Sequence, residues 1–159
     1  MTIALSDFRF SVLGIAYLVM LMAPNILWAR LRNEKQTSAA VENGPLVFLE
    51  RLGQVGMTVG LLFAPATPPP GPVRIALLVA SLLALALYEL AWSRYFRSPR
   101  TLADLYRALG PIPLALAILP VVGIALLALY EMHLVLLVCA AILGVGHISL
   151  SSQRAERAR

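Results

Sequence analysis

The chain has 159 residues, of which 60% are hydrophobic and 13% are charged, and its mean hydropathy is +0.82. Soluble domains carry about 25% charged residues, so this composition excludes a water-soluble globular domain as well as a disordered chain. The single cysteine, Cys139, excludes a disulfide-stabilised scaffold. We therefore predict one all-α integral-membrane domain over residues 1–159.

Five segments are long and apolar enough to cross the ~30 Å hydrocarbon core, which takes about 20 helical residues. They cover residues 10–28, 45–64, 73–92, 111–129 and 133–150. The last two belong to one apolar run of 40 residues, which as a single helix would extend about 60 Å. That run must therefore turn near Glu131, and the predicted architecture is a bundle of five transmembrane helices.

A short amphipathic helix is predicted at the membrane interface near residues 101–109. Thr101 and Asp104 match a capping box at its start, and Gly110 and Pro111 end it. The preceding segment also carries three aromatic residues on one helical face, Tyr88, Trp92 and Tyr95. Aromatic residues at this depth are typical of the belt at a membrane–water interface.

The basic residues are divided unequally between the two sides of a five-span protein. One side holds Arg30, Arg32, Lys35, Arg51, Arg94, Arg97, Arg100, Arg107, Arg154, Arg157 and Arg159, and the other holds Arg9 and Arg74. Because basic loops stay in the cytoplasm, the N-terminus is predicted outside and the C-terminus inside. Four spans would give a weaker bias of eight against five, so charge and length favour the same topology.

The net charge of +5 has a simple interpretation in such a protein. Basic residues that set topology face anionic lipids, so membrane lipids are the expected partners and nucleic acid is not. The N-terminus carries no basic region or convincing cleavage site, so the first span is expected to be retained. The predicted location is the inner (cytoplasmic) membrane of a bacterial cell, as a multi-pass protein.

Small residues predict where the helices pack, because close approach replaces the hydrophobic effect between helices in lipid. The second span contains Gly53, Gly56 and Gly60 on one side, while Glu50 and Gln54 lie nearly opposite. Both sides thus resemble protein-facing surfaces, which predicts a central position for this helix. The Gly56–Gly60 pair favours packing within the chain, and a homodimer through these glycines is the alternative.

Polar residues from four of the five spans are expected in the cytoplasmic half of the membrane. Charged groups inside a span cost about 2.5–3.5 kcal/mol each, so they indicate a functional site by default. The predicted ligand-binding residues are Asn25, Glu50, Arg51, Gln54, Tyr88, Glu89, Arg94 and His147. The simpler alternative is that these side chains reach the interface or pair with one another, since depth does not establish that they face one pocket.

Three functions remain open for this layer of polar residues. The first is binding, with transport as an extension, of a small amphiphile or lipid in a polar pocket. The second is an enzyme acting on lipid head groups, with His147 as acid/base and Glu50 or Glu89 orienting its imidazole. The third is a structural or accessory subunit without a pocket. Two separated histidines and one cysteine do not form a metal site, so neither a metal nor a cofactor is predicted, and a non-enzymatic function is favoured.

Four sequence runs carry a resemblance to a known group of proteins. They are Pro24-Asn-Ile-Leu-Trp28, Phe48-Leu-Glu-Arg-Leu-Gly53, Leu105-Tyr-Arg107 followed by Pro111-Ile-Pro113, and Gly144-Val-Gly-His-Ile148. With these runs the chain resembles a family of small, uncharacterised bacterial polytopic membrane proteins over most of its length. The resemblance implies five spans and an inner-membrane location, and it implies no activity.

Overall fold

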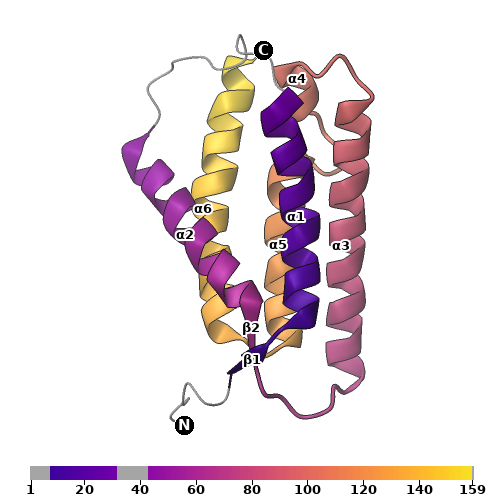
Figure 1. Ribbon diagram of the computed structural model, residues 1–159. Coiled ribbons are helices and arrows are strands. Elements are labelled where there is room, and N and C mark those ends of the chain that lie inside the picture. The colour runs from indigo at the N-terminus through magenta and orange to yellow at the C-terminus, as the bar shows by residue number, and fades with distance from the viewer. Residues whose placement is uncertain (1–7, 32–42, 159) are drawn as a thin grey trace.

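The computed structural model describes residues 8–31 and 43–158. Within these ranges the chain folds into five long helices, one single-turn helix and two three-residue strands (Figure 1). The elements in chain order are β1 (Phe8–Phe10), α1 (Val12–Leu31), α2 (Gly44–Leu62), β2 (Phe63–Pro65), α3 (Pro72–Phe96), α4 (Leu102–Leu105), α5 (Ala115–Tyr130) and α6 (Leu134–Arg157).

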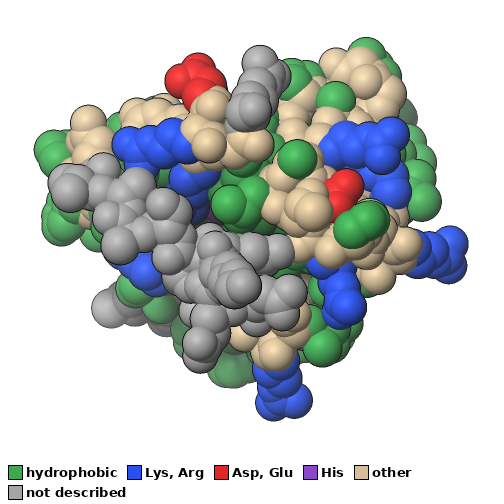
Figure 2. Space-filling model, turned by 90° about the horizontal axis from the view of Figure 1, so that it is seen from above, with side chains coloured by type: hydrophobic (Ala, Val, Ile, Leu, Met, Phe, Trp, Pro, Cys, Tyr) green, Lys and Arg blue, Asp and Glu red, His purple; other side chains and the backbone are tan. Residues whose placement is uncertain are grey.

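The long helices run in alternating directions along one bundle (Figure 1). One end, the ribbon end, holds β1, β2 and the turn at residues 131–133. The other, the α4 end, holds residues 97–112 and the last turn of α6. Viewed from the α4 end, arginine side chains are spread around the rim and acidic side chains are few among the described residues (Figure 2). The fold therefore gathers basic residues from separate loops at one end of the molecule.

Three helices of the described chain, α1, α3 and α6, are long and apolar enough to cross a membrane. The remaining two long helices meet the length and hydropathy expected of a membrane span less well. Helix α5 is apolar but has only 16 residues, and α2 contains Glu50, Arg51 and Gln54 among its 19. The all-helical fold and these three helices support a membrane protein. Each of the five predicted segments overlaps one long helix, whose ends differ from the predicted bounds by one to seven residues.

Helices α2 and α6 pack closely because glycines line their contact. A Cβ atom added at Gly53 would overlap the Leu143 backbone, and one at Gly56 would lie 2.6 Å from Cys139 Sγ. Gly56 and Gly60 thus face α6 of the same chain. The predicted central position of α2 is wrong: this helix lies at the periphery and leans outward along α6, since its close partner is one helix rather than several (Figure 1).

The aromatic residues near the end of α3 lie in the core. Tyr88, Trp92 and Tyr95 are each less than 5% exposed, and the Trp92 ring makes edge-on contacts with both tyrosine rings. The predicted interfacial belt is therefore wrong at these positions. Their shared face turns toward the bundle because α3 packs along α5 and contacts α1 through that face.

The predicted interfacial helix over residues 101–109 is also too long. Helix α4 is a single turn, which the capping box of Thr101 and Asp104 starts and Tyr106 ends. The chain then forms a tight turn at Gly110, whose φ of +57° suits glycine. The capping residues were thus identified correctly, but hydrogen bonds between Leu109 and Ile112 replace the second helical turn.

A short antiparallel ribbon, absent from the sequence-based expectation, closes the ribbon end. Phe10 of β1 pairs with Phe63 of β2, and their rings meet at 5.2 Å. The Ser11 N–H donates to the Leu62 carbonyl at 3.0 Å and extends this pairing into the start of α1. The ribbon therefore ties the beginning of α1 to the end of α2.

Candidate functional site

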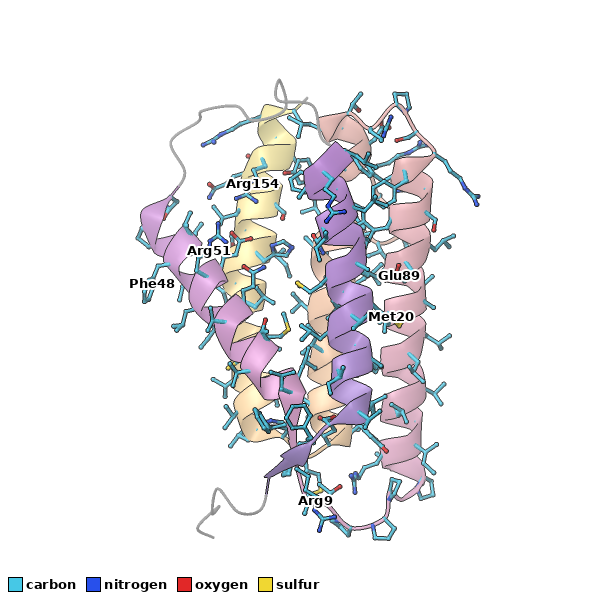
Figure 3. All side chains as sticks on the ribbon, in the orientation of Figure 1. Arg9, Met20, Phe48, Arg51, Glu89 and Arg154 are labelled. Atoms are coloured by element: carbon cyan, nitrogen blue, oxygen red, sulfur yellow. The ribbon has the colours of Figure 1, made fainter. Side chains whose placement is uncertain are left out.

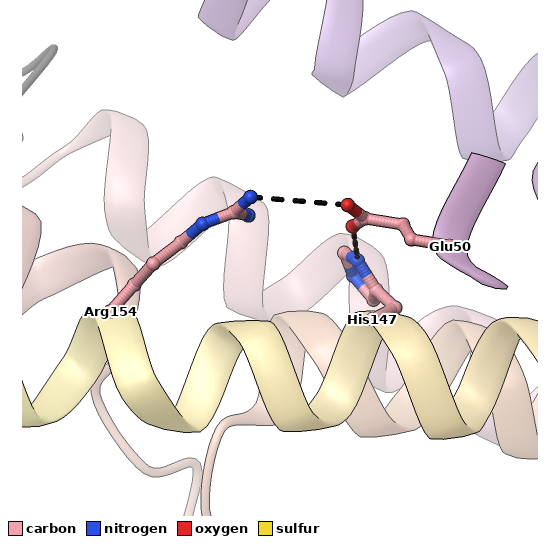
Figure 4. Close-up of polar contacts among 3 residues, drawn as sticks. All are labelled: Glu50, His147 and Arg154. Atoms are coloured by element: carbon pink, nitrogen blue, oxygen red, sulfur yellow. Dashed lines mark hydrogen bonds and ion pairs between the residues drawn. The ribbon is translucent and has the colours of Figure 1, made fainter. Parts of the chain in front are cut away.

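Glu50 of α2 and His147 of α6 form a direct polar contact (Figure 4). Each residue lies in the half of its helix nearer the α4 end. Glu50 Oε1 lies 2.6 Å from His147 Nδ1, and Glu50 Oε2 lies 3.9 Å from Arg154 Nη2. The Glu50 side chain is 14% exposed, whereas those of His147 and Arg154 are about one-third exposed. The carboxylate is therefore sheltered beneath two nitrogen-bearing groups that an external ligand can reach.

Glycine at position 146 makes this contact geometrically feasible. A Cβ atom at Gly146 would overlap the backbone nitrogen of Glu50 and lie 2.8 Å from the Leu46 carbonyl. With hydrogen in that place, the α2 and α6 backbones approach closely beside His147. Asn43 caps the start of α2 by accepting a hydrogen bond from the Leu46 N–H. Glu50 therefore lies about two turns into α2, at the point where this helix packs against α6 beside His147.

The second polar contact joins Asn25 of α1 to Tyr88 of α3. Asn25 Nδ2 donates to the Tyr88 hydroxyl and to the Leu21 carbonyl, both at 2.7 Å, and Tyr88 also donates to that carbonyl at 3.3 Å. Tyr88 is 2% exposed. Because these groups satisfy one another between two helices, their arrangement is that of an interhelical bond.

The other predicted site residues take no part in these two hydrogen-bonded contacts. Arg51 and Gln54 are exposed on α2. Arg94 donates to the Ala108 and Arg107 carbonyls at 2.7 and 3.0 Å. Glu89 is on α3, across α1 from Arg51 and Arg154 in the view of Figure 3, and its buried Oε1 has no hydrogen-bond partner within the described chain. The structure thus pairs His147 with Glu50, and Glu89 belongs to another part of the bundle.

A buried polar cluster at the ribbon end was not predicted. Glu131 is 6% exposed, and its Oε1 accepts a 3.2 Å hydrogen bond from Ser11, whose Oγ also accepts one from the Gly14 N–H. Burial raises the pKa of the Glu131 carboxyl above its ordinary value, and it lowers the pKa of the His133 imidazole. The polar run 130–133 predicts only a turn, because sequence does not show that the ribbon covers this turn.

A further buried hydrogen-bond chain crosses the middle of the bundle. The Tyr17 and Ser81 hydroxyls are 2.8 Å apart, and Ser81 Oγ donates to the Gly123 carbonyl at 2.6 Å. These bonds join α1, α3 and α5. The available signal in the sequence was a serine inside the apolar α3 segment, but this serine alone did not identify Tyr17 as its partner.

No family model, curated protein or solved structure matches this chain. The resemblance to a family of small bacterial membrane proteins therefore stays a prediction.

Proposed function

We propose that the chain is a five-span protein of a bacterial inner membrane that binds a small anionic amphiphile or lipid at the Glu50–His147–Arg154 cluster. The alternating directions of the five long helices support this topology, and so does the gathering of basic residues at the α4 end (Figures 1 and 2). Basic ends face the cytoplasm, so the cluster belongs to the cytoplasmic half of the bilayer.

The position of Arg154, which is about one-third exposed and lies 3.9 Å from Glu50 Oε2 beside the Glu50–His147 contact, carries the proposal. A carboxylate that accepts from Nδ1–H directs the imidazole and leaves Nε2 as its second polar atom. Arg154 lies beside the same carboxylate, and Arg51 is exposed one residue along α2. When Arg51 is counted with the Glu50–His147–Arg154 cluster, one acidic side chain lies near two arginines, and the net charge is positive even when His147 is neutral. Such a cluster favours a carboxylate or phosphate head group over a cationic one.

The second candidate function is catalysis on a lipid head group. A carboxylate-oriented imidazole is also the arrangement of a general acid/base, and the Glu50–His147 distance favours this reading specifically. In that function His147 would exchange a proton with the substrate, while Glu50 would serve as its positioning residue. The binding function requires the positive charge of Arg154 more than it requires the proton of His147, so the two candidates are separable.

Binding of lysophosphatidic acid to the purified chain in detergent tests the proposal, with uncharged monoacylglycerol of the same chain length as its comparison. Arg154→Gln should weaken binding of lysophosphatidic acid about tenfold, as expected for loss of one charge-assisted hydrogen bond, and should leave monoacylglycerol binding unchanged. His147→Ala should retain most lysophosphatidic acid binding. Glu156→Gln, an exposed change on the same helix, serves as the matched control.

Equal weakening for both probes would contradict recognition of the head group. Equal affinity of the parent chain and Arg154→Gln for lysophosphatidic acid would contradict the proposed site. Turnover of the probe by the parent chain that His147→Ala abolishes would support the enzymatic candidate instead.

A further inference from the structure

A surface cleft of about 460 Å³ lies at the α4 end of α3, away from the contact between α2 and α6. Its lining residues are Leu90, Ser93, Arg94, Arg97, Ser98 and Leu109. The lining changes in character along α3, because Leu90 lies toward the middle of the bundle and Arg97 follows the last residue of that helix. One part of the cleft is therefore apolar, and the part at the molecule's end is basic.

The two arginines of the cleft have different roles. Arg94 is held by the Ala108 and Arg107 carbonyls, so it joins the loop after α4 to α3 and forms a wall of the cleft. The Arg97 side chain is exposed, and the nearby Ser93 is exposed as well. Ser98 Oγ donates to the Tyr95 carbonyl and accepts from the Arg100 N–H, which holds the chain around Arg97. The geometry thus presents one guanidinium at a structured rim.

An exposed apolar stripe on α3 leads into this cleft. Val79, Leu83, Leu87 and Leu90 are between 38% and 59% exposed. Their spacing places them on one face of the helix, and Arg94 and Arg97 continue that face. The eleven-residue step from Val79 to Leu90 corresponds to about 16 Å, roughly half of the ~30 Å hydrocarbon core. The stripe therefore extends through about one leaflet and ends at the two arginines.

We propose that this cleft binds an anionic two-chain phospholipid. Arg97 would bind its phosphate together with the Ser93 hydroxyl, and one acyl chain would lie along the Val79–Leu90 stripe. The guanidinium fork matches phosphate geometry, and the α4 end carries the excess positive charge that attracts anionic lipids of one leaflet. A water-soluble phosphate would use the arginine without using the apolar stripe, so the combination of both features selects a lipid.

Native mass spectrometry of the chain released from detergent micelles tests this site. Phosphatidylglycerol and phosphatidylcholine of identical acyl chains serve as probes. The parent chain should retain phosphatidylglycerol preferentially, and Arg97→Gln should reduce that preference about fivefold, the effect expected for one basic residue near the bilayer surface. Arg157→Gln removes an exposed charge at the same end on α6 and should leave the preference unchanged. Ser93→Trp fills the cleft without altering charge, and it should also lower the preference for phosphatidylglycerol over phosphatidylcholine.

Several outcomes would overturn the inference. Equal losses in Arg97→Gln and Arg157→Gln would reveal a general charge effect, and equal retention of the two lipids by the parent chain would show no head-group recognition. Displacement of phosphatidylglycerol by millimolar inorganic phosphate would show that the apolar stripe contributes nothing. Arg154→Gln, which tests the cluster between α2 and α6, should not alter the phosphatidylglycerol preference, so the two sites can fail separately.

Discussion

At the scale of single residues, the same side-chain chemistry serves different purposes at the two ends of the bundle. Glu50 has His147 and Arg154 beside it, and both of these can be positively charged. Glu131 has only a hydroxyl hydrogen bond to Oε1, and its buried Oε2 has no partner within the described chain. The Glu50 carboxyl thus has a polar partner for each oxygen, whereas burial without a partner for Oε2 favours the neutral acid at Glu131.

Glu131→Gln should make the protein's stability less dependent on pH. Because burial raises the folded-state pKa of Glu131, the folded chain holds this proton more tightly than the unfolded chain does. The stabilisation is complete below the ordinary glutamate pKa and is lost as pH rises through the folded value. The variant and the parent should therefore unfold at nearly the same temperature at pH 3.5. At pH 8 the variant should unfold about 2–4 °C higher, the shift for ~1 kcal/mol.

Thermal unfolding in detergent across this pH range measures the effect. The comparison isolates Glu131, because His133 is common to both chains. The lowered pKa of His133 has the opposite effect, since the stability that it contributes is lost as pH falls. Glu156→Gln, exposed at the end of α6, should show no pH-dependent difference. A difference in unfolding temperature between variant and parent that stays constant from pH 3.5 to pH 8 would contradict a neutral buried Glu131.

At the scale of elements, the approximate positions of the five long helices were predictable, and the faces by which they pack were not. The apolar run from Val73 to Trp92 corresponds to α3 because its length suits a span, and the Pro-rich segment 65–72 marks where that helix starts. Burial of Trp92 depends on which face meets α5, a relation between distant segments that periodicity does not contain. The sequence does not reveal which face of α3 is buried, because lipid and the protein interior both favour apolar residues.

The candidate site shows the same division between depth and direction. Counting residues along each span places Glu50, Glu89 and His147 in one layer, yet only Glu50 meets the histidine. The deciding feature is Gly146, which lets α2 lie against α6 beside His147. Glycine patterns thus indicate that two helices approach closely, but a single sequence does not state which helix is the partner.

Gly146→Ala should weaken the pairing of α2 with α6. Its Cβ would overlap the Glu50 backbone, which cannot rotate away as a flexible side chain can. The helices must separate, at a cost of about 1–3 kcal/mol, as is typical of overpacking. Gly123→Ala is the matched control between α3 and α5, because its nearest neighbours would be 3.7 Å away, at ordinary contact distance.

Thermal unfolding of both glycine variants in the same detergent decides the matter. Gly146→Ala should unfold at a clearly lower temperature, and Gly123→Ala should remain close to the parent chain. Equal unfolding temperatures for the two variants would show that the close α2–α6 approach does not contribute to stability.

At the scale of the whole molecule, the alternating directions of the helices and the distribution of basic residues agree with each other. Alternating helices bring the end of α1, the start of α2 and the connection between α3 and α5 to the end that also holds the C-terminal end of α6, while the ribbon and the α5–α6 turn occupy the other end (Figure 1). Arg9 lies at the ribbon end and Arg154 toward the opposite end (Figure 3). If this bundle spans the membrane five times, eleven of the 13 basic residues belong to the cytoplasmic side.

Cysteine labelling in intact bacterial cells tests this topology directly. Replacement of Cys139 by Ala removes the native thiol, and single cysteines are then placed at Met132, which is 61% exposed in the α5–α6 turn, and at the exposed Glu156. A membrane-impermeant maleimide should label Met132→Cys in intact cells, whereas Glu156→Cys should react only after permeabilisation. Labelling of both positions from outside would show that α6 does not cross the membrane, and it would refute the five-span topology. Reversed labelling would place Arg9 and Arg74 in the cytoplasm, against the direction that eleven basic residues favour.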